Sequence, residues 1–176
     1  MLCPLDRSRV GLLCQAIVKY EPCLHIVLHQ PEIPYNTGSV GRTCVAVGAK
    51  LWLVRPLGFR LDDYYLRRAG LDYWEHLEFE VVDDWAALVA ALPPVKPWLL
   101  TKTATTPYTS VRYQRCDVLV FGSESQGLPP SLLAEHREQT LRIPIRPQVR
   151  SLNLSNSVAI VAYEALRQWE SAGNSD

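Results

Sequence analysis

Short apolar runs of strand length alternate with helical patterns along almost the whole chain, and this alternation limits the possible folds more than any other feature. Six runs have the length and composition of buried strands: "LHIVLH" (24–29), "KLWLVR" (50–55), "LEFEVV" (77–82), "WLLTK" (98–102), "DVLVFG" (117–122) and "TLRIPI" (140–145). Continuous apolar strands separated by helices need cover on both faces. The sequence therefore predicts an α/β fold, with a mostly parallel sheet and helices on both faces.

The segments between these strands predict helices: "TGSVGRTCVAVG" (37–48), "DDYYLRRAG" (62–70), "DDWAALVAAL" (83–92) and "PPSLLAEH" (129–136). Two of them open with Asp-Asp, which suits the positive end of a helix dipole, and two close at Gly, a common helix terminator. Towards the end of the chain, apolar residues recur at the three-and-four spacing of one helix face: Val158, Val161, Ala162, Ala165, Leu166 and Trp169. This spacing predicts a C-terminal helix.

The length of 176 residues, 48% of them apolar, fits one ordinary domain with a substantial core. We expect an N-terminal extension at residues 1–22, whose role the sequence leaves open, a single domain at 23–172 and a tail at 173–176. The five cysteines are odd in number and contain no C-x-x-C pair, which argues against a disulfide framework or a zinc site and favours the reducing cytoplasm.

No apolar run approaches the length of a membrane span, so we expect no membrane association. The stretch "VGLLCQAIV" follows Arg7 and Arg9, as in a signal peptide, but its apolar centre is short and no small-residue cleavage site comes after it. The four histidines show no metal-ligand spacing. We therefore expect them to be surface or packing residues and expect no bound metal.

The net charge is zero and the pI is near 6.9. The chain therefore lacks the overall positive charge that many nucleic-acid-binding proteins carry. Any site for a polyanion must therefore be local. The arginine clusters available for one are Arg7 and Arg9; Arg60, Arg67 and Arg68; and Arg142, Arg146 and Arg150.

Ligands of open α/β sheets bind beyond the carboxyl ends of the strands, and four predicted strands end in loops rich in Gly, Pro and small polar residues. These loops are "QPEIPYNTGSVGR", "TKTATT", "GSESQGLPP" and "PIRPQVRSLNLSNS". The third is not a P-loop or a nucleophile elbow, and the chain has no G-x-G-x-x-G. It predicts a tight turn carrying one carboxylate, Glu124. A plain turn or a backbone that approaches a flat ligand explains its glycines equally well.

Two further loops carry candidate ligand-binding side chains. Asn36 or Thr37 can cap the helix after the first strand, and Arg42 lies one to two turns into it. This arginine is either solvated, the usual case, or holds a phosphate or oxyanion with its fork of donors. The run before the C-terminal helix has more polar residues than one cap needs, namely Ser151, Asn153, Ser155, Asn156 and Ser157. It predicts a cap and leaves open whether the helix terminus also binds a ligand.

Taken together, "PEIPYNTGSVGRTC", "LVFGSESQGLP" and "IPIRPQVRSLNLSNSVAIVAYEA" resemble, in order and spacing, the three motifs of the SPOUT class of RNA methyltransferases. The segment "PLGFRLDDYYLRRAGLDYWEH" is similar to that of the small tRNA (cytidine/uridine(34)-2′-O)-methyltransferases within the class. The resemblance covers roughly residues 24 to 170. The chain departs from the pattern at Tyr35 and Ser123, where proline is common, and neither is a proposed catalytic residue.

The resemblance implies a C-terminal segment threaded as a deep trefoil knot, a rare exception among folds, together with a homodimer and S-adenosylmethionine bound in the knot. The implied cofactor-binding residues are Leu100, Thr101, Gly122, Ile143, Ser151 and Leu152. The implied catalytic residues are Arg42, Asn36, Glu124, Ser151 and Asn153. The implied reaction is methyl transfer to the ribose 2′-OH of the wobble nucleotide, in the anticodon stem-loop of tRNA.

Other functions stay open at this point. The chain could be a SPOUT 2′-O-methyltransferase that acts at another tRNA position or on ribosomal RNA, or a non-catalytic RNA-binding relative. A flavodoxin-like or nucleotide-binding module is disfavoured because the phosphate-binding loops are missing. The sequence does not decide which tRNAs are used, whether C34 or U34 is modified, whether a prior base modification is needed, or which group accepts the hydroxyl proton.

Overall fold

A computed structural model of the chain describes residues 22–61 and 73–173. Helices and strands alternate along it as predicted, with η denoting short 3₁₀ helices. The elements are β1 (Leu24–His29), α1 (Pro34–Val47), β2 (Lys50–Val54), η2 (Trp74–His76), β3 (Phe79–Val82), α3 (Trp85–Ala91), β4 (Pro97–Leu100), η3 (Tyr108–Ser110), β5 (Asp117–Phe121), α4 (Pro130–Glu135), η4 (Arg137–Gln139), β6 (Thr140–Leu141) and α5 (Leu154–Gly173). The helix predicted at 62–70 lies outside the described residues.

The described strands form one six-stranded sheet in the order β3-β2-β1-β5-β4-β6. Its strand pairs are parallel, which confirms the prediction. The last strand is shorter than predicted and ends at Leu141. Beyond it the chain pairs with a loop instead, because the Arg142 amide donates to the Thr106 carbonyl over 2.9 Å and the Arg142 carbonyl accepts from Tyr108 over 2.9 Å.

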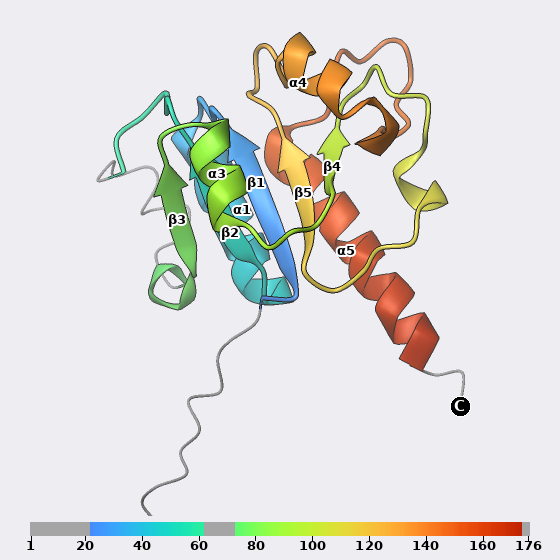
Figure 1. Ribbon diagram of the computed structural model, residues 1–176, viewed down its shortest axis with the longest axis horizontal. Helices are drawn as coiled ribbons and strands as arrows, with labels where there is room; N and C mark the ends of the chain where they lie inside the picture. Colours follow the sequence, from blue (N-terminus) through green and yellow to red (C-terminus); the bar gives the residue numbers. More distant parts are fainter. Residues whose placement is uncertain (1–21, 62–72, 174–176) are drawn as a thin grey trace, which may run out of the picture.

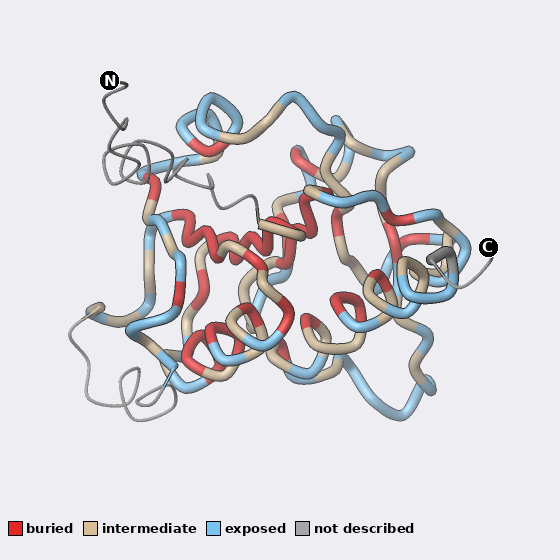
Figure 2. The backbone as a smooth tube through the Cα atoms, turned by 90° about the horizontal axis from the view of Figure 1, so that it is seen from below, coloured by how far each residue is buried: buried red, intermediate tan, exposed pale blue. Residues whose placement is uncertain are grey.

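Side chains from the sheet pack into two apolar clusters, one on each face. Leu24, Ile26 and Leu28 of β1 join the cluster covered by α1 and α5, whereas Val27 joins the cluster that includes residues of α3 and α4. Figure 1 shows α3 in front of the sheet and α1 and α5 behind it. In Figure 2 the buried parts of the tube lie in the interior of the molecule. Burial on both faces explains why the strands are continuous apolar runs.

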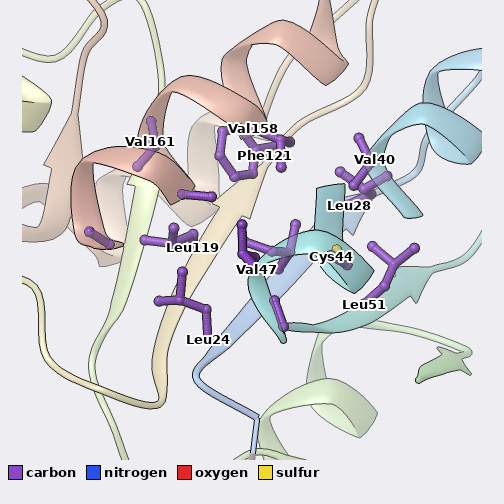
Figure 3. Packing of buried hydrophobic residues seen from close by; sticks show 14 of the residues in the cluster. Leu24, Leu28, Val40, Cys44, Val47, Leu51, Leu119, Phe121, Val158 and Val161 are labelled. Atoms are coloured by element: carbon purple, nitrogen blue, oxygen red, sulfur yellow. The ribbon is translucent and has the colours of Figure 1, made fainter. Parts of the chain in front are cut away.

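Helices α1 and α5 pack side by side against β1 and β5. In Figure 3, Val40 and Cys44 of α1 and Val158 of α5 converge on the same cluster as Phe121. The predicted face of the C-terminal helix is confirmed, since Val158, Val161, Ala162 and Ala165 are fully buried. Leu166 and Trp169 are partly buried against the same cluster. No helix in the described part of the chain is long and apolar enough to cross a membrane.

Two helix ends follow the local rules on which their prediction was based. Gly48 ends α1 in the left-handed conformation, with φ of 74°, and the Asp84 carboxylate caps α3 by accepting from the Ala87 amide over 2.8 Å. The predicted start of α1 is wrong. The helix begins at Pro34, a residue well suited to the first helical position, and Asn36 lies buried in the first turn instead of capping it.

His25 and His29 are buried packing residues, in agreement with the prediction. The His25 Nδ1 accepts a hydrogen bond from the Trp52 indole N–H over 3.0 Å, which requires the neutral ring. Burial, and secondarily the positive charge of Lys50, lowers the pKa of His25 from 6.5 to about 4.

We expect acidification to destabilise the protein through His25. The unfolded chain takes up the proton more readily than the folded one, so the stabilisation is complete above pH 6.5 and is lost as the pH falls towards about 4. This one group contributes a slope of at most about 1.4 kcal/mol per pH unit. Urea unfolding across this window tests it: His25→Gln keeps an acceptor for Trp52 and should show a shallower decline. Part of the slope remains because burial also lowers the pKa of His29. Equal slopes in the two proteins would contradict the expectation.

Candidate active site

A cavity of about 530 Å³ lies between α1 and the start of α5. It is lined by Tyr35, Asn36, Ser39, Arg42, Thr43, Asn153, Ser155, Asn156 and Ala159. Arg42 is the one charged side chain among these lining residues, and most of the others carry hydroxyl or amide groups. Such a wall suits a ligand rich in hydroxyl and phosphate oxygens.

The Asn153 side chain caps the start of α5. Its Oδ1 accepts from the backbone amides of Ser155 and Asn156, over 2.9 and 3.3 Å, and from the Ser155 hydroxyl over 2.7 Å. This is the geometry of an N-cap side chain, which satisfies amides of the first turn that have no helical partner. The cap predicted within the polar run is therefore confirmed.

Asn153 also begins a chain of side-chain hydrogen bonds, which we call the amide relay. Its Nδ2 donates to Asn36 Oδ1 over 2.9 Å, and Asn36 Nδ2 donates to Glu124 Oε1 over 2.9 Å. The orientation of both amides is fixed, because backbone amides use the Asn153 oxygen at one end and the Glu124 carboxylate accepts at the other. The relay joins the start of α5, the first turn of α1 and the loop after β5.

The Glu124 carboxylate also binds the segment just before α1, from a distant loop. Its oxygens accept from the amides of Glu32 and Ile33, over 2.8 and 3.3 Å, just before the helix begins. A negative charge at this position is favoured by the helix dipole. The prediction of a local cap at Asn36 or Thr37 was wrong because α1 begins at Pro34, which places both residues inside the helix. The Asn36 side chain enters the relay instead.

The Glu32 side chain in turn binds the loop after β5. Its carboxylate accepts from the backbone amide and the hydroxyl of Ser125, over 3.1 and 2.5 Å. The two loops are thus clamped in both directions, by Glu124 on one and Glu32 on the other. Neither Glu32 nor Ser125 belonged to the predicted site, and an acidic residue two positions before a helix is only a weak local signal.

Arg42 lies exposed on α1, and its guanidinium carbon stands 5.0 Å from the ring centroid of Tyr73. It shares the cavity with Asn36 and Asn153, so the structure brings these three predicted catalytic residues together. Glu124 is not among the cavity-lining residues, but its carboxylate accepts a hydrogen bond from the Asn36 side chain. Ser151 is exposed and does not line the cavity; it precedes the α5 cap by two residues.

Four of the six predicted cofactor-binding residues lie at or just beyond the carboxyl ends of three adjacent strands. Leu100 and Thr101 end or follow β4, Gly122 follows β5, and Ile143 follows β6, while Ser151 and Leu152 precede α5. The apolar members, Leu100, Ile143 and Leu152, are only partly buried. A partly covered apolar surface at this edge of the sheet suits a flat adenine ring.

At the same edge, the backbone at Gly122 lies close to the backbone of Gly127 and Leu128. The following loop folds back on itself, with Ser123 and Gly127 exchanging two backbone hydrogen bonds of 3.2 and 2.9 Å. A Cβ atom at Gly122 would lie 2.0 Å from the carbonyl carbon of Gly127, so no side chain fits there. Glycine at this position is therefore required for the closure of the loop after β5.

Residues 22–61 and 73–173 contain no group of three or more His, Cys, Asp or Glu side chains placed to hold a metal ion. In the same described ranges Arg60, Arg142, Arg146 and Arg150 are exposed. The remaining members of the predicted basic clusters, Arg7, Arg9, Arg67 and Arg68, lie outside them.

Comparison with known proteins assigns the family. Residues 23–163 match the SpoU rRNA Methylase family. The chain belongs to this family. The resemblance to the SPOUT class predicted from the three motifs is thereby confirmed, and the parallel sheet described above is the fold that this SpoU family member adopts.

Relatives of this SpoU protein are similar over nearly their whole length. The tRNA (cytidine(34)-2'-O)-methyltransferase of Escherichia coli (strain K12) is 47% identical over 146 residues, which cover 82% of this chain and 93% of the relative. That of Methylovorus glucosotrophus (strain SIP3-4) is 46% identical over 149 residues, covering 84% and 97%. A solved structure concerned with 2-OH methylation of C/U34 on tRNA is 46% identical, with a TM-score of 0.81, covering 84% of this chain and 97% of that chain.

Replacing Asn153 should separate the two roles of its side chain. Asn153→Ala removes both the cap and the relay bond, and we expect a loss of about 2 kcal/mol of unfolding free energy, roughly half from each. Asn153→Asp keeps an oxygen cap but cannot donate to Asn36, so it should lose less. Urea unfolding measures both, with Asn156→Ala, another cavity-lining amide, as the matched control. An Asn153→Ala variant as stable as the control would show that neither the cap nor the relay bond contributes to stability.

The loop after β5 offers a second comparison. Gly127 has φ of +71°, and a Cβ atom added there would have nothing within 4 Å, so Gly127→Ala should cost only the left-handed backbone penalty, about 1–2 kcal/mol. Gly122→Ala forces apart two stretches of backbone and should cost more, with a larger drop in melting temperature. The reverse order of melting temperatures would mean that the loop is not closed in this way.

Proposed function

We propose that this chain transfers the methyl group of S-adenosylmethionine to the ribose 2′-OH of the wobble nucleotide, position 34, of tRNA. The proposal depends on one observation: Arg42, Asn36 and Asn153 meet on one cavity. The proposed substrate is inferred from a relative, the tRNA (cytidine(34)-2'-O)-methyltransferase of Escherichia coli, which is 47% identical to this chain over 93% of its own length.

In this proposal Leu100, Thr101, Gly122, Ile143, Ser151 and Leu152 hold the cofactor. S-adenosylmethionine, when bound, supplies a methyl group on a positively charged sulfur, so the leaving group is already activated. What remains for the protein is to place the hydroxyl in line with that methyl group and to assist the loss of its proton.

Arg42 is the residue best suited to act on the hydroxyl. A guanidinium is too weakly acidic to give up a proton at neutral pH and so cannot serve as a base. It acts instead as a donor that orients the hydroxyl and stabilises the negative charge developing on its oxygen. A phosphate of the bound RNA is our candidate for the proton acceptor.

The relay residues position the substrate. Each amide nitrogen of Asn36 and Asn153 carries two hydrogens, and the relay bonds use one of each, so one donor per residue remains for the ribose or a phosphate. Glu124 is committed to the amides of Glu32, Ile33 and Asn36, which argues for a positioning role and not for a general base. Ser151 stands in the loop between the cofactor-binding residues and the relay.

We further propose a homodimer formed through α1 and α5. Both helices carry large exposed aromatic side chains, Tyr35 at 62% exposure and Tyr163 at 54%. Two copies would pool Arg60, Arg67, Arg68, Arg146 and Arg150 over one groove, which compensates for a net charge of zero when an anticodon stem-loop binds. The trefoil knot would lie between β6 and α5. The free thiols of Cys23, Cys44 and Cys116 support the cytoplasm as the site of action.

The decisive experiment is transfer of labelled methyl from S-adenosylmethionine to unmodified total tRNA, with the product mapped by nuclease digestion and mass spectrometry. We expect label on the ribose of nucleotide 34, and a loss of at least about 100-fold in rate for Arg42→Ala because a charge-stabilising donor is removed. Arg42→Lys should also be impaired, since lysine lacks the fork of donors. Arg137→Ala, an exposed arginine away from the cavity, serves as the control and should stay active.

Each other outcome points to a different function. Methyl transfer to ribosomal RNA, or to another tRNA position, would replace the proposed substrate but keep the reaction. RNA binding without transfer would indicate a non-catalytic relative. Failure to bind S-adenosylmethionine would overturn the enzymatic proposal.

A further inference from the structure

Among the described residues, Arg42 contacts an aromatic ring and pairs with no carboxylate. Its guanidinium carbon lies over Tyr73, 5.0 Å from the ring centroid, which is within the range of a cation–π contact, about 6 Å. Within residues 22–61 and 73–173, none of the ion pairs involves Arg42. Tyr73 is 41% exposed, so the contact forms at the surface of the molecule, next to the cavity that Arg42 lines.

The position of Tyr73 is set by packing against the residue next to Arg42. A Cβ atom at Gly41 would lie 2.9 Å from Leu77 Cδ2 and 3.5 Å from Trp74 Cζ3, so the 3₁₀ turn η2 sits directly on α1 where the helix has no side chain. Leu77 is buried, and the Trp74 ring contacts Phe79 of β3 with centroids 5.2 Å apart. The Tyr73 carbonyl accepts from the His76 amide over 3.0 Å, which fixes the start of the turn.

The type of partner matters for what Arg42 can do. A carboxylate would bind the N–H donors of the guanidinium in a fork and neutralise its charge. An aromatic face attracts the cation through the ring quadrupole and uses none of these donors in conventional hydrogen bonds. The charge and the fork therefore stay available for a hydroxyl or phosphate in the cavity, while the long side chain is confined.

From this geometry we propose that Tyr73 is a positioning residue for Arg42. Its ring holds the guanidinium at the cavity without occupying the donors that the reaction needs. The inference rests on the proposed methyl transfer, in which Arg42 acts on the ribose hydroxyl. It assigns the requirement to the ring face, so the phenolic hydroxyl is dispensable.

The test compares Tyr73→Phe, which keeps the ring, with Tyr73→Leu, which keeps apolar bulk without a π face. We expect Tyr73→Phe to retain kcat within about twofold and Tyr73→Leu to lose between about fivefold, the value of an exposed cation–π contact, and about 100-fold, the effect of a 1 Å misplacement. The Kd for S-adenosylmethionine should be unchanged in both. Tyr73→Leu in an Arg42→Ala background should cause no further loss, because the ring acts only through the arginine.

A second measurement does not depend on activity. The NMR signals of the Arg42 side chain should be shifted upfield by the Tyr73 ring in the wild-type protein and in Tyr73→Phe, and should lose that shift in Tyr73→Leu. If the wild-type protein transfers no methyl group, the proposed function fails while the NMR shift still reports on the contact. An unshifted Arg42, full activity of Tyr73→Leu, or an equal loss in the Arg42→Ala background would each overturn the role of Tyr73.

Discussion

The arrangement of the site depends on the hydrogen bonds that the Glu124 carboxylate accepts. This carboxylate satisfies two backbone amides just before α1 and orients Asn36, and through Asn36 it is linked to the side chain that caps α5. Hydrogen bonds to an ionised acceptor are shorter and stronger than neutral ones, so this single group can hold three segments together. Because the cavity lies between α1 and α5, its shape follows from these bonds.

The same arrangement keeps negative charge away from the cavity. Two neutral amides, Asn36 and Asn153, stand between the Glu124 carboxylate and the start of α5, and Arg42 is held by the ring of Tyr73. A carboxylate beside Arg42 would have neutralised the one charged side chain among the cavity-lining residues. The site therefore combines a wall of fixed neutral amides with a cation that pairs with no carboxylate of residues 22–61 and 73–173, which suits an anionic substrate and a developing alkoxide.

The parallel sheet makes these contacts possible. The carboxyl ends of β1, β4, β5 and β6 face one edge, so the loops that follow them meet there although they are far apart in the chain. Burial on both faces keeps the strands, and hence the loop origins, in fixed register. The reciprocal clamp between Glu32 and Glu124 then joins the loops after β1 and β5, the two central strands.

The sequence by itself determined the features that arise from local periodicity and local chemistry. It predicted the parallel strands, the buried face of α5, the cap within its polar run, the helix that carries Arg42 and the loop that carries Glu124. Only the tertiary structure decided the features that join distant residues. The hydrogen bond from the Ile33 amide to Glu124 spans 91 residues, and the relay bond between Asn36 and Asn153 spans 117 residues. No local pattern encodes such partners, because a side chain satisfies whichever donor or acceptor the folded sheet brings to it.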